Sequence, residues 1–396
     1  MKDAEIKEVS GDKLDSLLEM VFYAFFTSPG DVEKLIKNKH YFKEDLCYAI
    51  YEDDNPVSGI MLKPIPQNVR GVIKNMCGVA EVVTNPEARR KGYAKKLMNL
   101  AFQKMKENKQ IFSTLYPFKE EFYERMGYVT FPQYRTAVFS PQSLVPLLKM
   151  ELDGSVERIN IKEGIDVYLD FIKKYQLKTH GMGIKHDTEQ ARMKDEANYW
   201  LAVAKDKNGE IIGLMTYRIT GFWKEIKVRH FYVNNSLAKY LLLQWIAHHA
   251  DQVNEIHLPI HPDDNPEIWV NDTFWGPKGK IVSRDWVPSC MGRVVLVDKI
   301  SGIYVGEGSV SIKIKDEQCE WNNKAYLFES KDGILDISET EQYDCELTIQ
   351  GLSAIIYGCY NLEDFPFKKW GDMSEENKHK IEKLFPKKLP YLHADF

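Results

Sequence analysis

The residues best suited to chemistry in this sequence are three consecutive cations, Arg89, Arg90 and Lys91, followed directly by Gly92. They come after the run 79–83, which is rich in β-branched residues and typical of a buried strand that ends before a proline. Beyond Gly92, small and apolar residues recur with the spacing of one helix face: Ala94, Leu97, Met98, Ala101 and Met105. Strand, basic loop and helix start favour an anion site, because the first helix amides lack an intrahelical partner and the helix dipole attracts negative charge. From the residues alone, a solvated basic turn is an equally good interpretation.

Tyr123 is a second candidate, in the segment 122–128, which is typical of a helix end, a glycine stop and a new strand. A phenol has a pKa of about 10, so it carries its proton at neutral pH and can donate it to a leaving group. On residue type alone, a packing aromatic is the better interpretation of Tyr123. Glu81, a carboxylate in the strand before the basic loop, is a candidate base or a paired structural charge.

The composition is that of a globular protein. A length of 396 residues suggests two or three domains, and 44% hydrophobic with 28% charged residues is ordinary. The net charge of −5 argues against nucleic acid as a partner, since phosphate binding needs a basic face. The sequence has no apolar run long enough for a bilayer and no signal-peptide core, so we expect a cytoplasmic protein without a membrane partner. The six cysteines are dispersed, and neither they nor the histidines have the spacing of a metal site, so no metal is expected.

The order of the expected elements divides the chain into residues 1–145, 146–287 and 288–396. The first region combines a helix over 13–26 with strands and helices of one mixed sheet, which we expect the segments 128–131 and 134–139 to close. The second region repeats this order, but Asn234, Asn235 and Ser236 stand where the first has its basic loop, so we expect no phosphate site there. The third region begins with a strand at 294–297 and contains further strands and two helices.

The first region resembles the GNAT N-acetyltransferase superfamily. The resemblance rests on Arg89, Gly92 and Ala94 after a strand that ends in Val83-x-x-Pro86, and on the Phe122–Tyr128 segment. It implies an acetyl-CoA site in which the cations and the helix start hold the pyrophosphate, while the backbone of the strand end lines the thioester and pantetheine. The expected cofactor-binding residues are therefore Val82, Val83, Thr84, Arg89, Arg90, Lys91, Gly92, Tyr93, Ala94 and Lys95. The same resemblance implies that Tyr123 is the general acid.

The whole chain resembles the Eis (enhanced intracellular survival) acetyltransferases. The third region carries this resemblance in residues 291–298, 319–322, 347–353 and 384–386 and in the terminal Ala394-Asp395-Phe396. The implied fold class is α/β with mixed sheets: two tandem GNAT domains followed by a sterol-carrier-like α+β domain. It also implies that the C-terminal carboxylate of Phe396 is the general base, which fits a chain end unusually rich in apolar residues. Without the resemblance, a frayed terminus would be the better interpretation.

The expected activity is N-acetylation of a primary amine, with a small polycation such as an aminoglycoside as the acceptor that the resemblance implies. Protein or peptide amines are the alternative acceptors. A CoA- or lipid-binding protein without catalysis is the alternative from another class, and self-association into a homo-oligomer is open.

Overall fold

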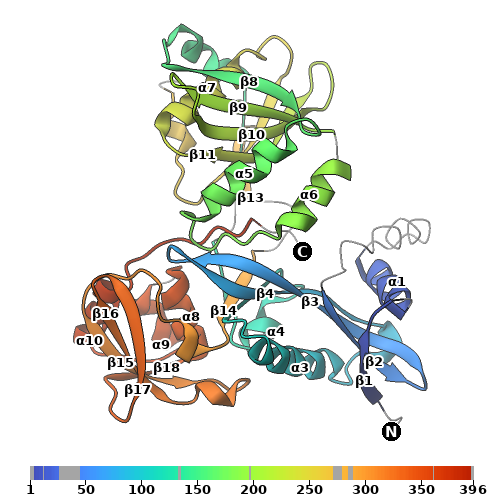
Figure 1. Ribbon diagram of the computed structural model, residues 1–396, viewed down its shortest axis with the longest axis vertical. Helices are drawn as coiled ribbons and strands as arrows, with labels where there is room; N and C mark the ends of the chain where they lie inside the picture. The colour runs from blue at the N-terminus through green and yellow to red at the C-terminus, as the bar shows by residue number, and fades with distance from the viewer. Residues whose placement is uncertain are drawn as a thin grey trace. The chain divides into compact units, whose positions relative to one another are not determined.

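The computed structural model describes residues 4–11, 13–25, 45–132, 135–195, 198–270, 279–283, 289–359 and 361–393. The chain forms two compact units (Figure 1). Unit 1 consists of Met1–Phe131, Thr179–Lys185 and Ser289–Phe396, and unit 2 of Pro132–Lys178 and His186–Pro288. The three regions expected from the sequence are thus distributed over two units. Within the described ranges, no helix combines the length and the apolar character that a membrane span requires.

Unit 1 contains a seven-stranded sheet with the order β1-β2-β3-β4-β5-β14-β6. Its strands are β1 (Ala4–Val9), β2 (Leu46–Glu52), β3 (Asn55–Val69), β4 (Val72–Thr84), β5 (Phe112–Leu115), β6 (Val129–Thr130) and β14 (Met291–Val294). The pairs are antiparallel except β4 and β5, which are parallel. Helix α1 (Lys13–Phe25) packs on the face that carries Met61, and α3 (Tyr93–Glu107) on the opposite face, which carries Ile60 and Leu62.

The sixth strand of this sheet corrects two expectations. The segment 134–139 was expected to close the first sheet, but the strand β7 (Arg135–Phe139) pairs with β12 and β13 in unit 2. Its place in the first sheet is taken by β14, which pairs with β5 and β6. The strand expected in the third region at 294–297 thus lies three residues earlier, at Met291–Val294. Both strands are short and apolar, so their sequence patterns predict strands without specifying the sheet that they join.

Unit 2 repeats the strand order of the first sheet as β8-β9-β10-β11-β12-β7-β13, with β11 and β12 as the parallel pair. The further strands are β8 (Gly154–Asn160), β9 (Trp200–Asp206), β10 (Ile211–Ile219), β11 (Glu225–Val233), β12 (Glu255–Ile260) and β13 (Lys280–Ser283). Its helices are α5 (Ile165–Gln176), α6 (His186–Asp195) and α7 (Ser236–Ala247). In α7 the N-cap Asn235 accepts a hydrogen bond from Ala238 N at 2.9 Å, so its own side chain satisfies an amide that an anion would need.

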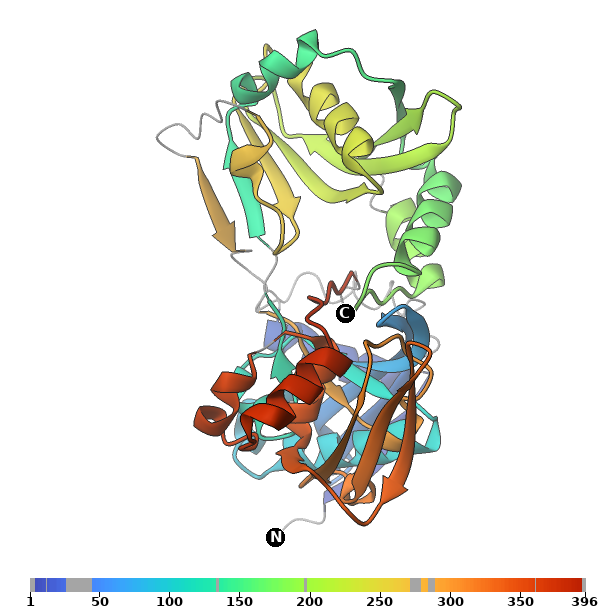
Figure 2. The ribbon, with the colours of Figure 1, turned by 90° about the vertical axis from the view of Figure 1, so that its left-hand side faces the viewer.

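The C-terminal part of unit 1 forms a four-stranded sheet of order β17-β16-β15-β18, with helices packed against it (Figure 2). The strands are β15 (Ser309–Lys315), β16 (Ala325–Lys331), β17 (Ile334–Thr340) and β18 (Cys345–Thr348), and the helices are α8 (Ile349–Tyr357), α9 (Phe365–Lys368) and α10 (Glu375–Leu384). One hydrophobic core contains residues of both sheets, among them Phe112 and Val129 from the first and Phe328 from the second. The sterol-carrier-like part is therefore continuous with the first sheet.

The turn between β3 and β4 is joined to the end of α8 by Arg70. Its guanidinium is buried and donates to three carbonyl oxygens, those of Ile355 at 2.9 Å, Ile356 at 2.7 Å and Pro386 at 3.0 Å. The C-terminal carbonyls of a helix carry partial negative charge, which stabilises a cation there. The backbone N–H of Arg70 donates to Nδ1 of His180 at 2.9 Å, and Nε2 of His180 lies 3.1 Å from the carbonyl of Tyr357. His180 must therefore be neutral with its proton on Nε2, and burial next to Arg70 lowers its pKa from 6.5 to about 3.

We expect unit 1 to lose stability in mild acid through His180. The unfolded chain binds a proton at this histidine below about pH 6.5, whereas the folded chain does not until about pH 3, so stability is complete above pH 6.5 and falls as the pH decreases. One such proton lowers the free energy of unfolding by about 2 kcal/mol between pH 7 and pH 5. Urea unfolding of His180→Asn at both pH values should show a smaller pH effect than wild type. The exposed His248→Asn should keep the wild-type effect, and an unchanged effect in His180→Asn would contradict the assignment.

Candidate active site

Strands β4 and β5 part half-way along β4. Their parallel ladder runs from Met76 opposite Phe112 to Val79 opposite Leu115, and Pro117 soon follows β5. β4 continues to Thr84 with β3 on one edge, while its other edge has no strand beside it among the described residues. The expected pantetheine-lining residues Val82, Val83 and Thr84 lie on this unpaired stretch. Such an edge offers main-chain groups to an extended ligand, as a neighbouring strand would.

The start of α3 lies directly after this open edge. The loop turns through two left-handed residues, Arg90 with φ 64° and Gly92 with φ 79°, and Gly92 is the N-cap. The first helical bond is from Lys96 N to Gly92 O at 3.1 Å. No acceptor in the described part of the chain binds the amides of Tyr93, Ala94 or Lys95. A Cβ on Gly92 would meet no protein atom, so the site does not need glycine for lack of space. Glycine instead allows the positive φ and leaves the backbone accessible to a ligand. These features fit the pyrophosphate of CoA.

The three cations of the loop have different surroundings. Arg89 and Arg90 are exposed, and Arg89 Nε donates to Thr84 O at 3.3 Å across the loop. Lys91 instead binds both carboxylate oxygens of Glu52, at 2.8 and 3.0 Å, and the same carboxylate accepts a hydrogen bond from the Tyr93 hydroxyl. The ion pair holds the loop to β2 and partly neutralises Lys91. Its expected contact with phosphate stays a prediction.

Tyr123 lies in the five-residue helix α4 (Glu120–Glu124) and is 2% exposed. Its ring packs edge-on against Phe118, Phe122 and Tyr128, with centroids 5.4, 5.0 and 6.0 Å away. It belongs to the same core cluster as Val79 and Leu115, the last pair of the β4–β5 ladder. Burial raises the pKa of Tyr123, so the phenol is protonated at neutral pH.

The Tyr123 hydroxyl has no hydrogen-bond partner among the described residues, whereas the neighbouring Tyr128 hydroxyl pairs with Ser113 Oγ at 2.7 Å. A buried hydroxyl without a partner costs about 1–3 kcal/mol, and such groups are rare outside functional sites. Of the two tyrosines, Tyr123 is therefore the one whose hydroxyl is not engaged with another described residue.

Phe396, the expected general base, lies outside the described residues. The described chain ends at His393, and the residues before it are held in unit 1: Tyr391 N donates to His180 O at 2.8 Å. Leu392 is 1% exposed in the core cluster of Ile65 and Met76, on β3 and β4. The segment leading to the terminus is thus packed against β3 and β4 of the first sheet.

Glu81, the competing base, lies at a bulge between β3 and β4 with φ 52°. It is partly buried, and desolvation raises its pKa, against the opposing effect of Lys63. The sequence analysis missed the ionic group beside it: the buried Asp45 carboxylate binds Lys63 at 3.0 Å and Lys185 at 2.8 Å. Lys63 lies within the largely apolar strand β3, and this signal could have predicted a buried charged partner.

Comparison with known proteins agrees with this geometry. Residues 5–131 match the acetyltransferase (GNAT) domain family, and residues 302–393 match the sterol carrier protein domain family. Residues 5–131 are therefore a GNAT acetyltransferase domain. Enzymes with this domain take the acetyl group from acetyl-CoA. The open edge of β4 and the amides at the start of α3, which have no acceptor in the described part of the chain, suit this donor. No curated protein matches the sequence.

Three solved structures share the fold over the entire chain. They are a GCN5-related N-acetyltransferase from Anabaena variabilis (TM-score 0.85, 17% identity), a probable N-acyltransferase from Enterococcus faecalis (0.83, 19%) and Eis1 from Mycobacterium abscessus (0.80, 14%). Each alignment covers 100% of this chain and 100% of the other. The order of two GNAT-like sheets and a sterol-carrier-like domain, expected from the sequence, is confirmed.

We expect the loop cations to contribute unequally to binding of acetyl-CoA. Arg89→Gln or Arg90→Gln should raise the KM for acetyl-CoA about tenfold at unchanged kcat, because each removes a charge-assisted phosphate contact. Lys91→Gln should have a smaller effect, since Glu52 already binds this ammonium. Steady-state kinetics with varied acetyl-CoA measure the difference. Equal KM increases for all three variants would contradict the distinction.

Proposed function

We propose that this acetyltransferase moves the acetyl group of acetyl-CoA directly to a primary amine, with Tyr123 as general acid and the C-terminal carboxylate of Phe396 as general base. The amine attacks the thioester carbonyl, its proton passes to the base, and the C–S bond breaks as the phenol protonates the departing thiolate. Both protons are accounted for, and no covalent enzyme intermediate is needed.

The observation that carries the proposal is the buried, protonated hydroxyl of Tyr123, which has no hydrogen-bond partner in the described part of the chain and belongs to the core cluster at the end of the β4–β5 ladder. A thiolate is a good leaving group but still gains from a proton donor in a site from which water is excluded. Phe118, 62% exposed and edge-on to the Tyr123 ring, forms the outer wall at this point.

For the base, the packing of Tyr391 and Leu392 in unit 1 supports a role of the terminus in the same unit. Desolvation raises the pKa of a carboxylate above its reference value, which makes the carboxylate a better proton acceptor. Glu81 is the alternative, because burial raises its pKa and it lies on β4 itself.

We propose a small polycationic amine, aminoglycoside-like, as the acceptor class, and protein or peptide amines as the alternative. The alternative from another class is a lipid- or CoA-binding role without catalysis. One pocket of the sterol-carrier-like part is lined by α8, α9 and α10 residues such as Ile355, Phe365 and Ile381 and has a volume of about 20 Å³. That is room for about one water molecule.

Release of free thiol from acetyl-CoA in the presence of a panel of amines tests the activity and the acceptor together.

Tyr123→Phe should lower kcat about a hundredfold while the KM for acetyl-CoA and the melting temperature stay near wild type, because only the proton donor is lost. Tyr217→Phe in unit 2 is the matched control: this phenol is also buried and accepts from Trp245 Nε1 at 3.2 Å, so its loss should affect stability but not kcat. Full kcat in Tyr123→Phe would remove the general acid from the proposal.

Adding two glycines after Phe396 should abolish turnover without changing the affinity for CoA, because the carboxylate would leave its place. Glu81→Gln should keep most of the activity. Steady-state rates and CoA titrations of both variants decide between the two bases. An extended chain at wild-type kcat, with an inactive Glu81→Gln, would assign the role to Glu81.

A further inference from the structure

The turn that carries Tyr123 has little stability of its own. α4 has five residues, too few for an isolated helix, and β6 has two. Within the turn, the amides of Met126 and Tyr128 both donate to the carbonyl of Tyr123, at 2.9 and 3.2 Å. The direction of the phenol therefore depends on what holds this turn from outside.

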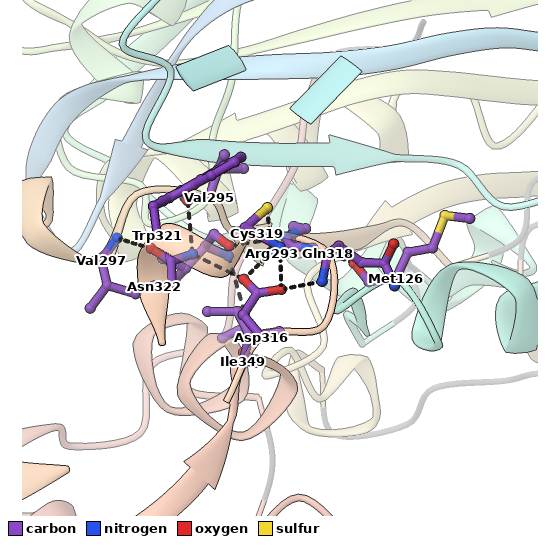
Figure 3. Close-up of polar contacts among 12 residues, drawn as sticks. Met126, Arg293, Val295, Val297, Asp316, Gln318, Cys319, Trp321, Asn322 and Ile349 are labelled. Carbon is purple, nitrogen blue, oxygen red and sulfur yellow. Dashed lines mark hydrogen bonds and ion pairs between the residues drawn. The ribbon is translucent and has the colours of Figure 1, made fainter. Parts of the chain in front are cut away.

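Two side chains hold its carbonyls from outside the turn, one from α8 and one from β14 of the first sheet. Gln350 Nε2, in the first turn of α8, donates to Glu124 O at 2.8 Å. Arg293 Nη1, on β14, donates to Met126 O (Figure 3). These two carbonyls flank the peptide segment directly after Tyr123. A Cβ on Gly127, whose φ is 89°, would lie 2.7 Å from Arg293 Nη1 and 2.8 Å from Ile349 Cγ2, so the turn rests closely on both elements.

Each nitrogen of the Arg293 guanidinium donates a hydrogen bond. Arg293 is 0% exposed, and its Nη2 binds Asp316 Oδ2 at 2.6 Å, while its Nε donates to Val294 O at 3.0 Å. The Asp316 carboxylate is held in turn by Asn322 Nδ2 at 2.9 Å and by the amides of Gln318 and Cys319, both at 3.1 Å (Figure 3). Because both oxygens of the Asp316 carboxylate accept hydrogen bonds, the Arg293–Asp316 pair is a rigid support.

The guanidinium also packs on the active-site core. Its centre lies 4.5 Å from the ring centroid of Phe102 on α3 and 5.9 Å from that of Tyr128. In the other direction, Ser353 of α8 accepts from Val294 N at 3.0 Å, which ties α8 and Gln350 to the same strand. The contacts to the turn thus form one connected group across β14, α8 and the loop after β15.

We propose that Arg293, supported by Asp316, and Gln350 are positioning residues for acetyl transfer. They bind the carbonyls of Glu124 and Met126 and so fix the direction of the Tyr123 phenol. The sterol-carrier-like part thereby serves the reaction by holding the turn of the general acid. This inference rests on the proposed role of Tyr123.

The test is a double-mutant cycle between positions 350 and 123. Gln350 is partly buried, so Gln350→Met removes the donor with little change in volume, and Gln350→Glu, which has no side-chain donor when ionised, is a second variant. Gln342→Met, an exposed glutamine of the same domain, is the matched control. Melting temperature, kcat and the KM for acetyl-CoA are measured for each, alone and with Tyr123→Phe.

We expect Gln350→Met and Gln350→Glu to lower kcat about tenfold at unchanged KM for acetyl-CoA, the cost of a misplaced catalytic group. In the Tyr123→Phe background the same substitutions should have no further effect on kcat, because the group that they position is gone. If Tyr123→Phe is impaired but Gln350 variants keep wild-type kcat, or if the two losses multiply, the positioning role is overturned while the proposed function stands. If Tyr123→Phe has full kcat, both fall.

Discussion

The separation of β4 from β5 after Val79 and Leu115 is the constraint on which the rest of the site depends. If β4 and β5 stayed paired to the end of β4, the main-chain groups on that edge of β4 would bond to β5, and none would be available to a ligand. Because the ladder stops, the far half of β4 has one edge without a strand beside it, and the chain then turns through Gly92 into α3, whose first amides have no acceptor; both statements hold for the residues that the structure describes. The buried phenol of Tyr123 belongs to the core cluster that contains the last paired residues. The proposed CoA site and the proposed proton donor thus both lie where this ladder ends.

Unit 1 is completed by segments far apart in the sequence. β14 fills the position between β5 and β6, and β7 fills the equivalent position in the sheet of unit 2. The GNAT sheet is therefore incomplete without residues from beyond 290. The buried Arg293–Asp316 pair lies at this junction, where an unpaired charge would be strongly destabilising. The pair connects the inserted strand β14 to the loop after β15.

The local elements of the site were predictable because their signals are local. β-branched residues before Pro86 predicted β4, and helical spacing predicted α3, whose Leu97, Met98, Ala101 and Met105 are buried. The exchange of β7 and β14 was not predictable, since strand propensity contains no information on which distant strand is the partner. The Lys91–Glu52 and Arg293–Asp316 pairs also escaped prediction, because no local pattern marks two charges that only the fold brings together. Three cations that look equivalent in the sequence therefore differ in the structure. The absence of a phosphate site at the start of α7 stays a prediction, which is supported by the hydrogen bond that the Asn235 side chain accepts from Ala238 N.

The central claim is that CoA is held by the unpaired edge of β4 and the start of α3, in unit 1 alone. Amide hydrogen exchange with and without saturating CoA tests it most directly, because both elements offer backbone N–H groups. The account predicts slower exchange at residues 82–84 and 92–95 and no change at 234–238, where Asn235 already caps α7. Protection at the start of α7, or none at the start of α3, would contradict it.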